Sequence, residues 1–122
     1  MFDWNEPNPA SWGRSPRVVD ETLRDGLQSA STRDPPLDRK LAILHAMGAI
    51  GVDFASLGLP AAGPRAAHDV LELARECAAA RLPRRATAAA RTTEADVRVI
   101  ADISQTAGVA IDVYAFIGCS PI

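Results

Sequence analysis

The stretch Val109-Ala-Ile-Asp-Val-Tyr-Ala-Phe-Ile117 is the clearest β-strand in the sequence, because β-branched and aromatic residues make up most of it. A helix is predicted before it: Thr92 or Thr93 supplies an N-cap, apolar residues recur at helical spacing from Val97 onward, and Gly108 ends the segment. The strand is therefore reached through a helix, which indicates a parallel sheet with helical crossovers.

The same unit repeats toward the N-terminus. Strands are predicted at residues 17–22, 52–57 and 84–90, and helices at residues 37–49 and from Pro64 onward. The predicted order is β-α-β-α-β-α-β, which makes the chain an α/β protein with parallel strands and with its helices on one side of the sheet. Two architectures fit this order: a doubly wound open sheet and part of a (β/α)8 barrel.

The first loop and the length favour the barrel. No Gly-x-Gly-x-x-Gly or Walker loop follows the first predicted strand, which weakens the interpretation as a nucleotide-binding doubly wound sheet. A full barrel needs about 250 residues and eight units, whereas the 122-residue chain supplies four strands. We therefore predict a parallel βαβαβαβ fold that forms the first half of a (β/α)8 TIM barrel, preceded by an N-terminal arm at residues 1–16.

Charge and cysteine content exclude several classes of function. A formal net charge of −2 argues against nucleic acid or an anionic membrane as the main partner. No apolar run approaches the roughly 18 residues of a membrane span, and the first residues are too polar for a secretory signal. Cys77 and Cys119 form neither a disulfide framework nor a zinc motif, so we expect a cytoplasmic protein.

The densest polar cluster follows the first predicted strand, at Asp20-Glu-Thr-Leu-Arg-Asp-Gly-Leu-Gln28. Ligands of parallel α/β folds bind at this end of the strands. The Asp25 carboxylate can ligate a hard divalent cation, and the Arg24 guanidinium offers a planar fork to a carboxylate or enolate oxygen. An ordinary salt bridge within the loop is the alternative explanation of the same pair.

Three stretches resemble the DRE-TIM metallolyases, a family that includes isopropylmalate synthase, homocitrate synthase, citramalate synthase and hydroxymethylglutaryl-CoA lyase. The segment from Asp20 to Ser29 resembles the family signature. Residues 51–62, which contain Gly58-Leu-Pro-Ala61, look like the second strand and its loop, and residues 114–122 look like the fourth strand. The resemblance implies that residues 17–122 are part of a pyruvate carboxyltransferase-like TIM-barrel domain.

The resemblance also implies a chemistry for named positions. Asp25 is expected to be a ligand of a divalent metal (Mg²⁺ or Mn²⁺, with Zn²⁺ as an alternative), and Arg24 to be the catalytic residue that steadies a developing alkoxide. Gln28, Arg91 and Ser120 are expected to bind substrate together with Arg24. The implied partners are a 2-oxo acid and acetyl-CoA. For Arg91 a helix cap or a salt bridge is an alternative, and for Ser120 a loop cap.

Several positions depart from the family pattern. Leu27 stands where the synthases usually have Glu but where the lyase has Leu, which leaves the direction of the reaction open. Ser56 stands where an acidic residue is usual, and Thr93 where homocitrate synthases carry a substrate-contacting His. The metal-binding His-x-His pair is absent, because His45 and His68 both fall within predicted helices.

Two hypotheses follow for the chain as a whole. In the first, it is the N-terminal part of an isopropylmalate synthase-like acyltransferase, with a lyase as the alternative. In the second, it is a non-catalytic half-barrel. Under either hypothesis the metal site is incomplete, so the 122-residue polypeptide alone is predicted to be inactive. The exposed edges of such a sheet favour a homodimer or poor solubility.

Overall fold

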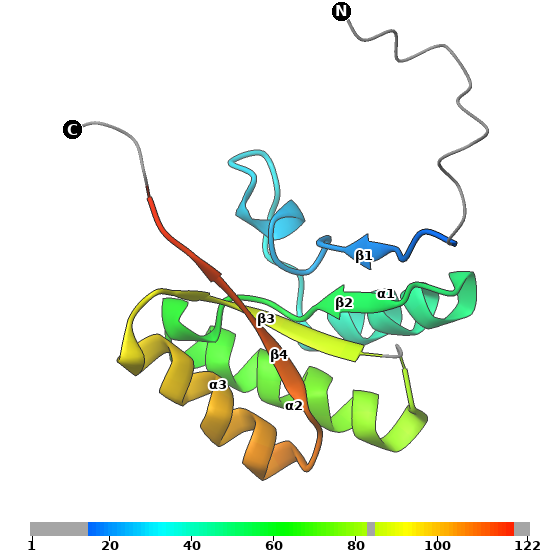
Figure 1. Cartoon of the computed structure of the whole chain (residues 1–122). Helices are drawn as coiled ribbons and strands as arrows, with labels where there is room; N and C mark the ends of the chain where they lie inside the picture. Colours follow the sequence, from blue (N-terminus) through cyan, green and yellow to red (C-terminus); the bar gives the residue numbers. More distant parts are fainter. Residues whose placement is uncertain (1–14, 83–84, 119–122) are drawn as a thin grey trace, which may run out of the picture.

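The computed structural model describes residues 15–82 and 85–118, and its four parallel strands form one sheet (Figure 1). The strands are β1 (Val19–Asp20), β2 (Phe54–Ser56), β3 (Arg85–Arg91) and β4 (Ile111–Phe116). Their order in space is β1-β2-β3-β4, the same as their order in the chain. A doubly wound sheet would reverse this order at a switch point. The predicted α/β fold, consistent with half a TIM barrel, is therefore confirmed.

Three helices connect the strands: α1 (Leu37–Ile50), α2 (Pro64–Ala80) and α3 (Glu94–Ala107). Two short 3-10 turns, η2 (Gly26–Gln28) and η3 (Pro60–Ala62), lie in the loops after β1 and β2. The helices pack on one side of the sheet, where α1 and α2 share the core built on β2 (Figure 1). Within the described ranges, no helix combines the length and the apolar character needed to cross a membrane.

The ends of the elements follow local chemistry. Of the two predicted caps of α3, the structure uses Thr93, whose hydroxyl accepts a hydrogen bond from the Asp96 amide at 3.3 Å. Helices α1 and α3 end at Gly51 and Gly108, whose φ angles of 82° and 69° lie in the left-handed region that glycine tolerates. The first two strands are shorter than predicted, because only residues in register with a neighbour join the ladder.

Alternation along the strands gives the sheet two different faces. Ala55 of β2, Leu57 directly after that strand and Ala86 of β3 pack against the helices. Leu44 of α1 and Leu73 of α2 are fully buried among them. The opposite face is here called the inner face. It carries Phe54 and Ser56 of β2 together with the residues of β1, β3 and β4 that the register places on the same side of the sheet. Its members are Val19, Phe54, Ser56, Arg85, Thr87, Ala89, Arg91, Asp112, Tyr114 and Phe116.

Candidate functional site

The polar segment after β1, here called the motif loop (residues 20–28), forms a compact turn. The Glu21 carbonyl accepts hydrogen bonds from the amides of Arg24 and Gly26, both at 3.1 Å. The Asp20 carboxylate accepts a third bond from the Thr22 amide at 2.7 Å. Leu23 is buried in the main core, which anchors the turn to the body of the protein. The backbone of the motif loop is therefore held at the carboxyl end of β1.

Arg24 lies between two carboxylates. Its Nε donates to Glu21 Oε2 at 2.8 Å, and its Nη1 donates to Asp25 Oδ1 at 3.2 Å. The Arg24 side chain is 27% exposed, whereas that of Asp25 is 69% exposed. The structure thus brings Arg24 and Asp25 together, and it adds Glu21, to which the sequence analysis assigned no role. The signal was present in the spacing, since an acid three residues before an arginine is placed to pair with it within one turn.

Gln28 and Arg24 line the same pocket, which has a volume of about 360 Å³. The pocket lies between the motif loop and the N-terminus of α2, and its apolar wall comes from Leu23, Leu27, Leu57 and Val70. Its charged wall is formed by Asp34, Lys40, Arg65 and Asp69. The predicted substrate contacts Arg24 and Gln28 therefore border one cavity.

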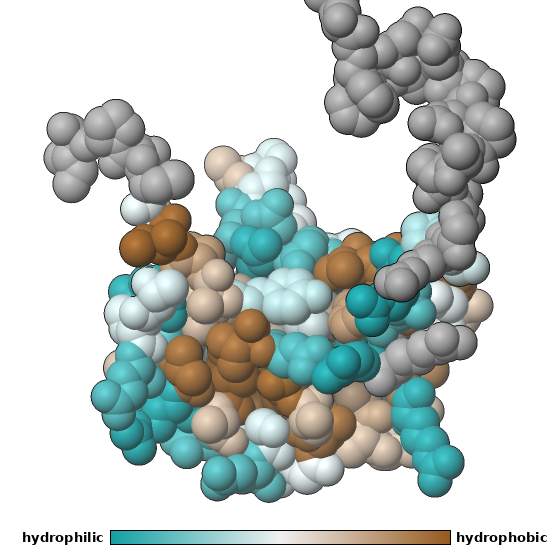
Figure 2. All heavy atoms as spheres, viewed as in Figure 1, coloured by the Kyte–Doolittle hydropathy of each residue, from teal (hydrophilic) through white to brown (hydrophobic). Residues whose placement is uncertain are grey.

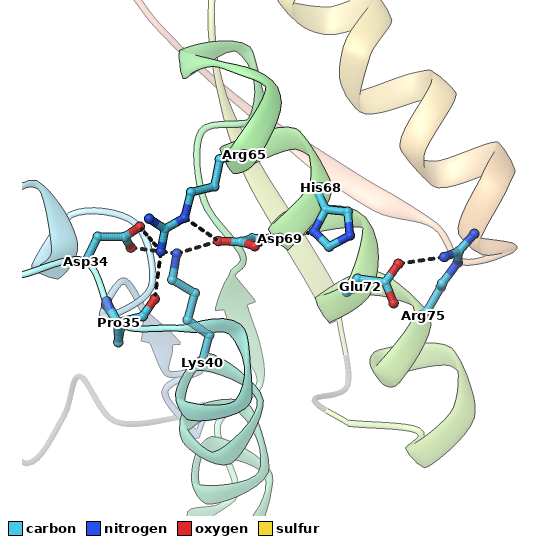
Figure 3. A network of polar contacts seen from close by, with 8 residues as sticks. All are labelled: Asp34, Pro35, Lys40, Arg65, His68, Asp69, Glu72 and Arg75. Carbon is cyan, nitrogen blue, oxygen red and sulfur yellow. Dashed lines mark hydrogen bonds and ion pairs between the residues drawn. The ribbon is translucent and has the colours of Figure 1, made fainter.

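The charged wall is a connected ionic cluster, shown in Figure 3. Lys40 Nζ lies 2.6 Å from Asp34 Oδ1 and 2.8 Å from Asp69 Oδ2, and Arg65 Nη2 lies 3.0 Å from Asp34 Oδ2. Lys40 and Asp69 are both buried. Burial by itself would lower the pKa of Lys40, but the bonds to Asp34 and Asp69 outweigh it, so the pKa is raised and the amine stays charged.

This cluster was not predicted. Its members come from the loop before α1, from α1 and from α2, so no local pattern joins them. One signal of the cluster was present in the sequence. Lys40, which directly precedes Leu41, is a charged residue on the apolar side of a predicted helix. The cluster ties the loop that follows the motif loop to the N-terminal turn of α2 (Figure 3).

Arg91 ends β3 and forms a two-pronged bond with Asp96 at the start of α3. Its Nε and Nη2 each donate to one Asp96 carboxylate oxygen at 2.8 Å, and its amide donates to Asp96 Oδ2 at 3.1 Å. The Thr93 hydroxyl adds a bond to Asp96 Oδ1 at 3.0 Å. The guanidinium of Arg91 therefore holds the pKa of Asp96 far below its usual range. Of the three roles considered for Arg91, the structure contains the salt bridge, and contact with substrate stays a prediction.

The remaining predicted site residue, Ser120, lies outside the described residues, as does Cys119.

The profile of the HMGL-like family matches residues 15–122, a range that includes the motif loop and all four strands. The chain belongs to the HMGL-like family. This match confirms the resemblance to the DRE-TIM metallolyases. A comparison with curated proteins found no match.

HMGL-like proteins generally bind a divalent metal, so the donors of this chain can be tested against one. In residues 15–82 and 85–118, no three side chains of His, Cys, Asp or Glu come together in a metal-binding group. Asp25 is the one predicted ligand, and it already accepts a bond from Arg24. Hard divalent cations take about six oxygen ligands. The described residues alone therefore do not fit such an ion.

The two histidines and Cys77 have structural surroundings in this HMGL-like chain. His45 Nε2 lies 2.7 Å from Glu76 Oε1, and His68 Nδ1 lies 3.6 Å from Asp69 Oδ1, on the helices that cover the sheet. Cys77 is buried, and burial raises the pKa of its thiol to about 12, which keeps it protonated and unreactive.

Ser56 lies on the inner face of the sheet, in register with Thr87 of β3. Its side chain is fully buried, and its hydroxyl has no hydrogen-bond partner among the described residues. The neighbouring Thr87 is equally buried, but its hydroxyl donates to the Ala55 carbonyl at 3.3 Å. The middle of the sheet thus carries a small, uncharged inner surface.

Proposed function

We propose that this chain is the N-terminal part of a metal-dependent acyl-CoA:2-oxo acid C-acyltransferase, similar to 2-isopropylmalate synthase. Such an enzyme joins the acetyl group of acetyl-CoA to the keto carbon of a 2-oxo acid. The observation that carries the proposal is the pairing of Arg24 with Asp25 at the carboxyl end of β1 in an HMGL-like chain. A salt bridge on the surface would not by itself indicate this function. Here the two residues belong to the segment that resembles the family signature.

Arg24 is the residue to which we assign catalysis. A guanidinium beside the reacting keto carbon stabilises the oxygen that becomes negative when the new carbon–carbon bond forms. Glu21 holds the guanidinium at Nε and leaves Nη2 without a bond to another described residue, so that nitrogen is the donor we assign to the substrate oxygen. Gln28 borders the adjoining cavity and is assigned to the rest of the 2-oxo acid.

The other assignments are parts of the same proposal. Asp25 is assigned to a divalent metal (Mg²⁺, Mn²⁺ or Zn²⁺) whose remaining ligands come from outside the described residues, and Arg91 and Ser120 to substrate. Acetyl-CoA, a 2-oxo acid and a second copy of the chain are the proposed partners. A cytoplasmic location is also proposed, since the two cysteines form no disulfide framework.

One observation favours a second candidate function, a carbon–carbon lyase of the hydroxymethylglutaryl-CoA type. Leu27 follows Gly26 at the position where synthases usually have Glu, and it forms part of the apolar pocket wall. A leucine there supplies no charge to the motif loop. Under either activity we expect the isolated polypeptide to have no turnover, and the same holds for a non-catalytic half-barrel.

Binding is therefore the appropriate test of this proposal. Ligand-observed NMR with 2-oxoisovalerate and Mg²⁺ should detect an interaction with the full chain, and Arg24→Gln should abolish it. Arg75→Gln is the matched control, because Arg75 also pairs with an acid three residues earlier, Glu72, but lies on α2 away from the motif loop. If both variants bind equally well, the proposal is wrong. Release of CoA from acetyl-CoA by the unmodified chain above background would instead contradict the expectation that the isolated polypeptide has no turnover.

A further inference from the structure

Glu21 contacts Arg24 through both its main chain and its side chain. Its carbonyl oxygen accepts a hydrogen bond from the Arg24 amide at 3.1 Å, and its carboxylate accepts one from Arg24 Nε at 2.8 Å. The Glu21 and Arg24 side chains are 31% and 27% exposed, so this bond is better shielded from water than the bond to Asp25, whose side chain is 69% exposed. Figure 2 shows that the segment after β1 projects from the sheet with a largely hydrophilic surface. The guanidinium is therefore bonded to a residue whose own backbone the turn fixes.

The nitrogen that an acid occupies decides which donors of an arginine stay available. On α2, the Glu72 carboxylate accepts from Nη1 of Arg75, at the tip of the guanidinium. At the carboxyl ends of β1 and β3, Arg24 and Arg91 instead donate from Nε, which lies at the base of the guanidinium. A bond at Nε restrains the plane of the group, and it leaves the nitrogens of the tip as further donors.

The two arginines held at Nε differ in how many acids share them. Asp96 takes both Nε and Nη2 of Arg91, each at 2.8 Å, in a two-pronged bond. Arg24 divides its bonds, with Nε to Glu21 at 2.8 Å and Nη1 to Asp25 at 3.2 Å. Within the part of the chain that the structure describes, neither Nη2 of Arg24 nor Oδ2 of Asp25 is bonded to another residue. Sharing between two acids therefore keeps a donor of Arg24 open that a single acid would occupy.

We propose that Glu21 is the positioning residue of Arg24: by holding Nε, it prevents Asp25 from closing a two-pronged bond to Nη1 and Nη2. Those two nitrogens form a planar fork that matches a carboxylate. Once Nε is released, the guanidinium is free to turn this fork toward Asp25, to which it is already bonded. Glu21 thus keeps Nη2 open for an oxygen of a 2-oxo acid. The inference rests on the proposed function, because that function assigns Nη2 to the substrate.

Binding of 2-oxoisovalerate to the full chain, followed by ligand-observed NMR with Mg²⁺ present, gives the first test. Glu21→Ala should raise the dissociation constant by about tenfold, as expected when one charge-assisted hydrogen bond to the ligand is lost. Glu21→Gln keeps an acceptor oxygen, so it should bind within about threefold of the unmodified chain. Glu72→Ala is the matched control, since Glu72 is also 31% exposed and also bonds an arginine three residues later, Arg75. It should leave binding unchanged.

Stability separates a positioning role from a structural one. Ion pairs at the surface contribute little to folding, so Glu21→Ala and Glu72→Ala should have closely similar melting temperatures. If Glu21→Ala binds as tightly as the unmodified chain while Arg24→Gln does not bind, the positioning role is wrong and the proposed function stands. Equal losses of binding in Glu21→Gln and Glu21→Ala also overturn the positioning role. If Arg24→Gln still binds, the proposed function itself fails.

A double variant tests the competition with Asp25. When a chelator replaces Mg²⁺, the Asp25 carboxylate influences the ligand only through its bond to Arg24. Under this condition, Glu21→Ala combined with Asp25→Asn should bind 2-oxoisovalerate more tightly than Glu21→Ala alone, because an amide cannot accept two bonds from the fork. Equal or weaker binding by the double variant contradicts the competition.

Exchange of the Arg24 Nε–H proton with water tests the bond without any ligand. Its signal in a ¹⁵N NMR spectrum is assigned by its absence in Arg24→Gln. The Arg24 proton should exchange more slowly than that of Arg75, whose Nε is not bonded to any described residue, because a hydrogen bond protects against exchange. Glu21→Ala should make the two rates equal. Equal rates in the unmodified chain overturn the proposal, whether or not the chain binds a 2-oxo acid.

Discussion

Lys40 and Asp69 stand 29 positions apart in the sequence, yet Nζ of the first lies 2.8 Å from Oδ2 of the second, between α1 and α2. Both side chains are less than 10% exposed, and Asp34 supplies a second carboxylate to the same amine. An ion pair that joins two helices is therefore buried inside the protein. It borders the cavity that Arg24 and Gln28 also line.

Breaking this buried pair should be costly. Lys40→Met removes the buried cation between the two carboxylates and leaves them the exposed Arg65 guanidinium, which lies 3.0 Å from Asp34 but 3.9 Å from Asp69. We expect the free energy of unfolding to fall by on the order of 3 kcal/mol. Urea unfolding at neutral pH measures the loss. Arg39→Met is the control, because the Arg39 side chain lies in an exposed ion pair with Asp38 and its loss should change stability by about 0.5 kcal/mol or less. Adding Asp69→Leu to Lys40→Met should restore part of the loss; a further loss contradicts the explanation.

The bond between Arg91 and Asp96 predicts a dependence of stability on pH. Asp96 has a folded-state pKa below its ordinary value of 3.8, chiefly because the Arg91 guanidinium bonds to it. Its contribution to stability is therefore complete above that ordinary value and is lost as the pH falls toward the folded-state pKa. Asp96→Asn should lower the urea midpoint at pH 7 and flatten its acid decline.

The matched control for that prediction is Asp102→Asn, the same substitution at an exposed position of α3. It should leave both the midpoint at neutral pH and the slope of the acid decline close to those of the unmodified chain. If the urea midpoints of the two variants fall in the same way as the pH is lowered, the ion pair at the end of β3 does not govern the pH dependence of stability.

Ser56 and Thr87 give a paired prediction for the inner face. Ser56→Ala removes a buried hydroxyl that lacks a partner among the described residues, so stability should stay the same or rise. Thr87→Val removes a buried donor to the Ala55 carbonyl and should cost about 1 kcal/mol. Guanidinium unfolding compares the two. A larger loss for Ser56→Ala than for Thr87→Val would mean that the serine hydroxyl has a partner after all.

Metal addition should leave the isolated chain unchanged. The described residues offer Asp25 without further grouped ligands, so millimolar Mn²⁺ or Mg²⁺ should not raise the melting temperature, and chelator should not lower it. Differential scanning fluorimetry is sufficient for the measurement. A rise of several degrees that Asp25→Asn abolishes would show a complete site in this polypeptide.

The helices could be predicted closely because their signals are local. Leu37–Ile50 and the start of α2 at Pro64 match the spacing of apolar residues, and Thr93 caps α3 as one of two predicted residues. The strand predicted at residues 84–90 has the weakest local signal of the four, since alanine has low strand propensity. The structure forms it at Arg85–Arg91 because its alanines let helices pack closely against the sheet.

The site could be predicted only in part. Arg24, Asp25 and Gln28 lie within one short segment, so their proximity follows from the sequence. The partners that fix the side chains of the charged pocket wall could not be predicted in this way. Asp34 and Asp69 reach Lys40 from other elements, and these long-range contacts depend on how α1 and α2 pack rather than on any motif.

The fork between Arg91 and Asp96 also constrains how an anion could be recognised at the end of β3. An incoming carboxylate that took both guanidinium nitrogens would leave the Asp96 side chain, which is 3% exposed, with the Thr93 hydroxyl and the Arg91 amide as its partners among the described residues. An anion that bound there would displace the Asp96 carboxylate from the Arg91 guanidinium rather than bind a free guanidinium. Affinity would then be set by the difference between two carboxylates. Because the pKa of Asp96 is held far below its usual range, acid would protonate an ordinary carboxylate ligand before it neutralised Asp96, so lowering the pH would favour the internal pair.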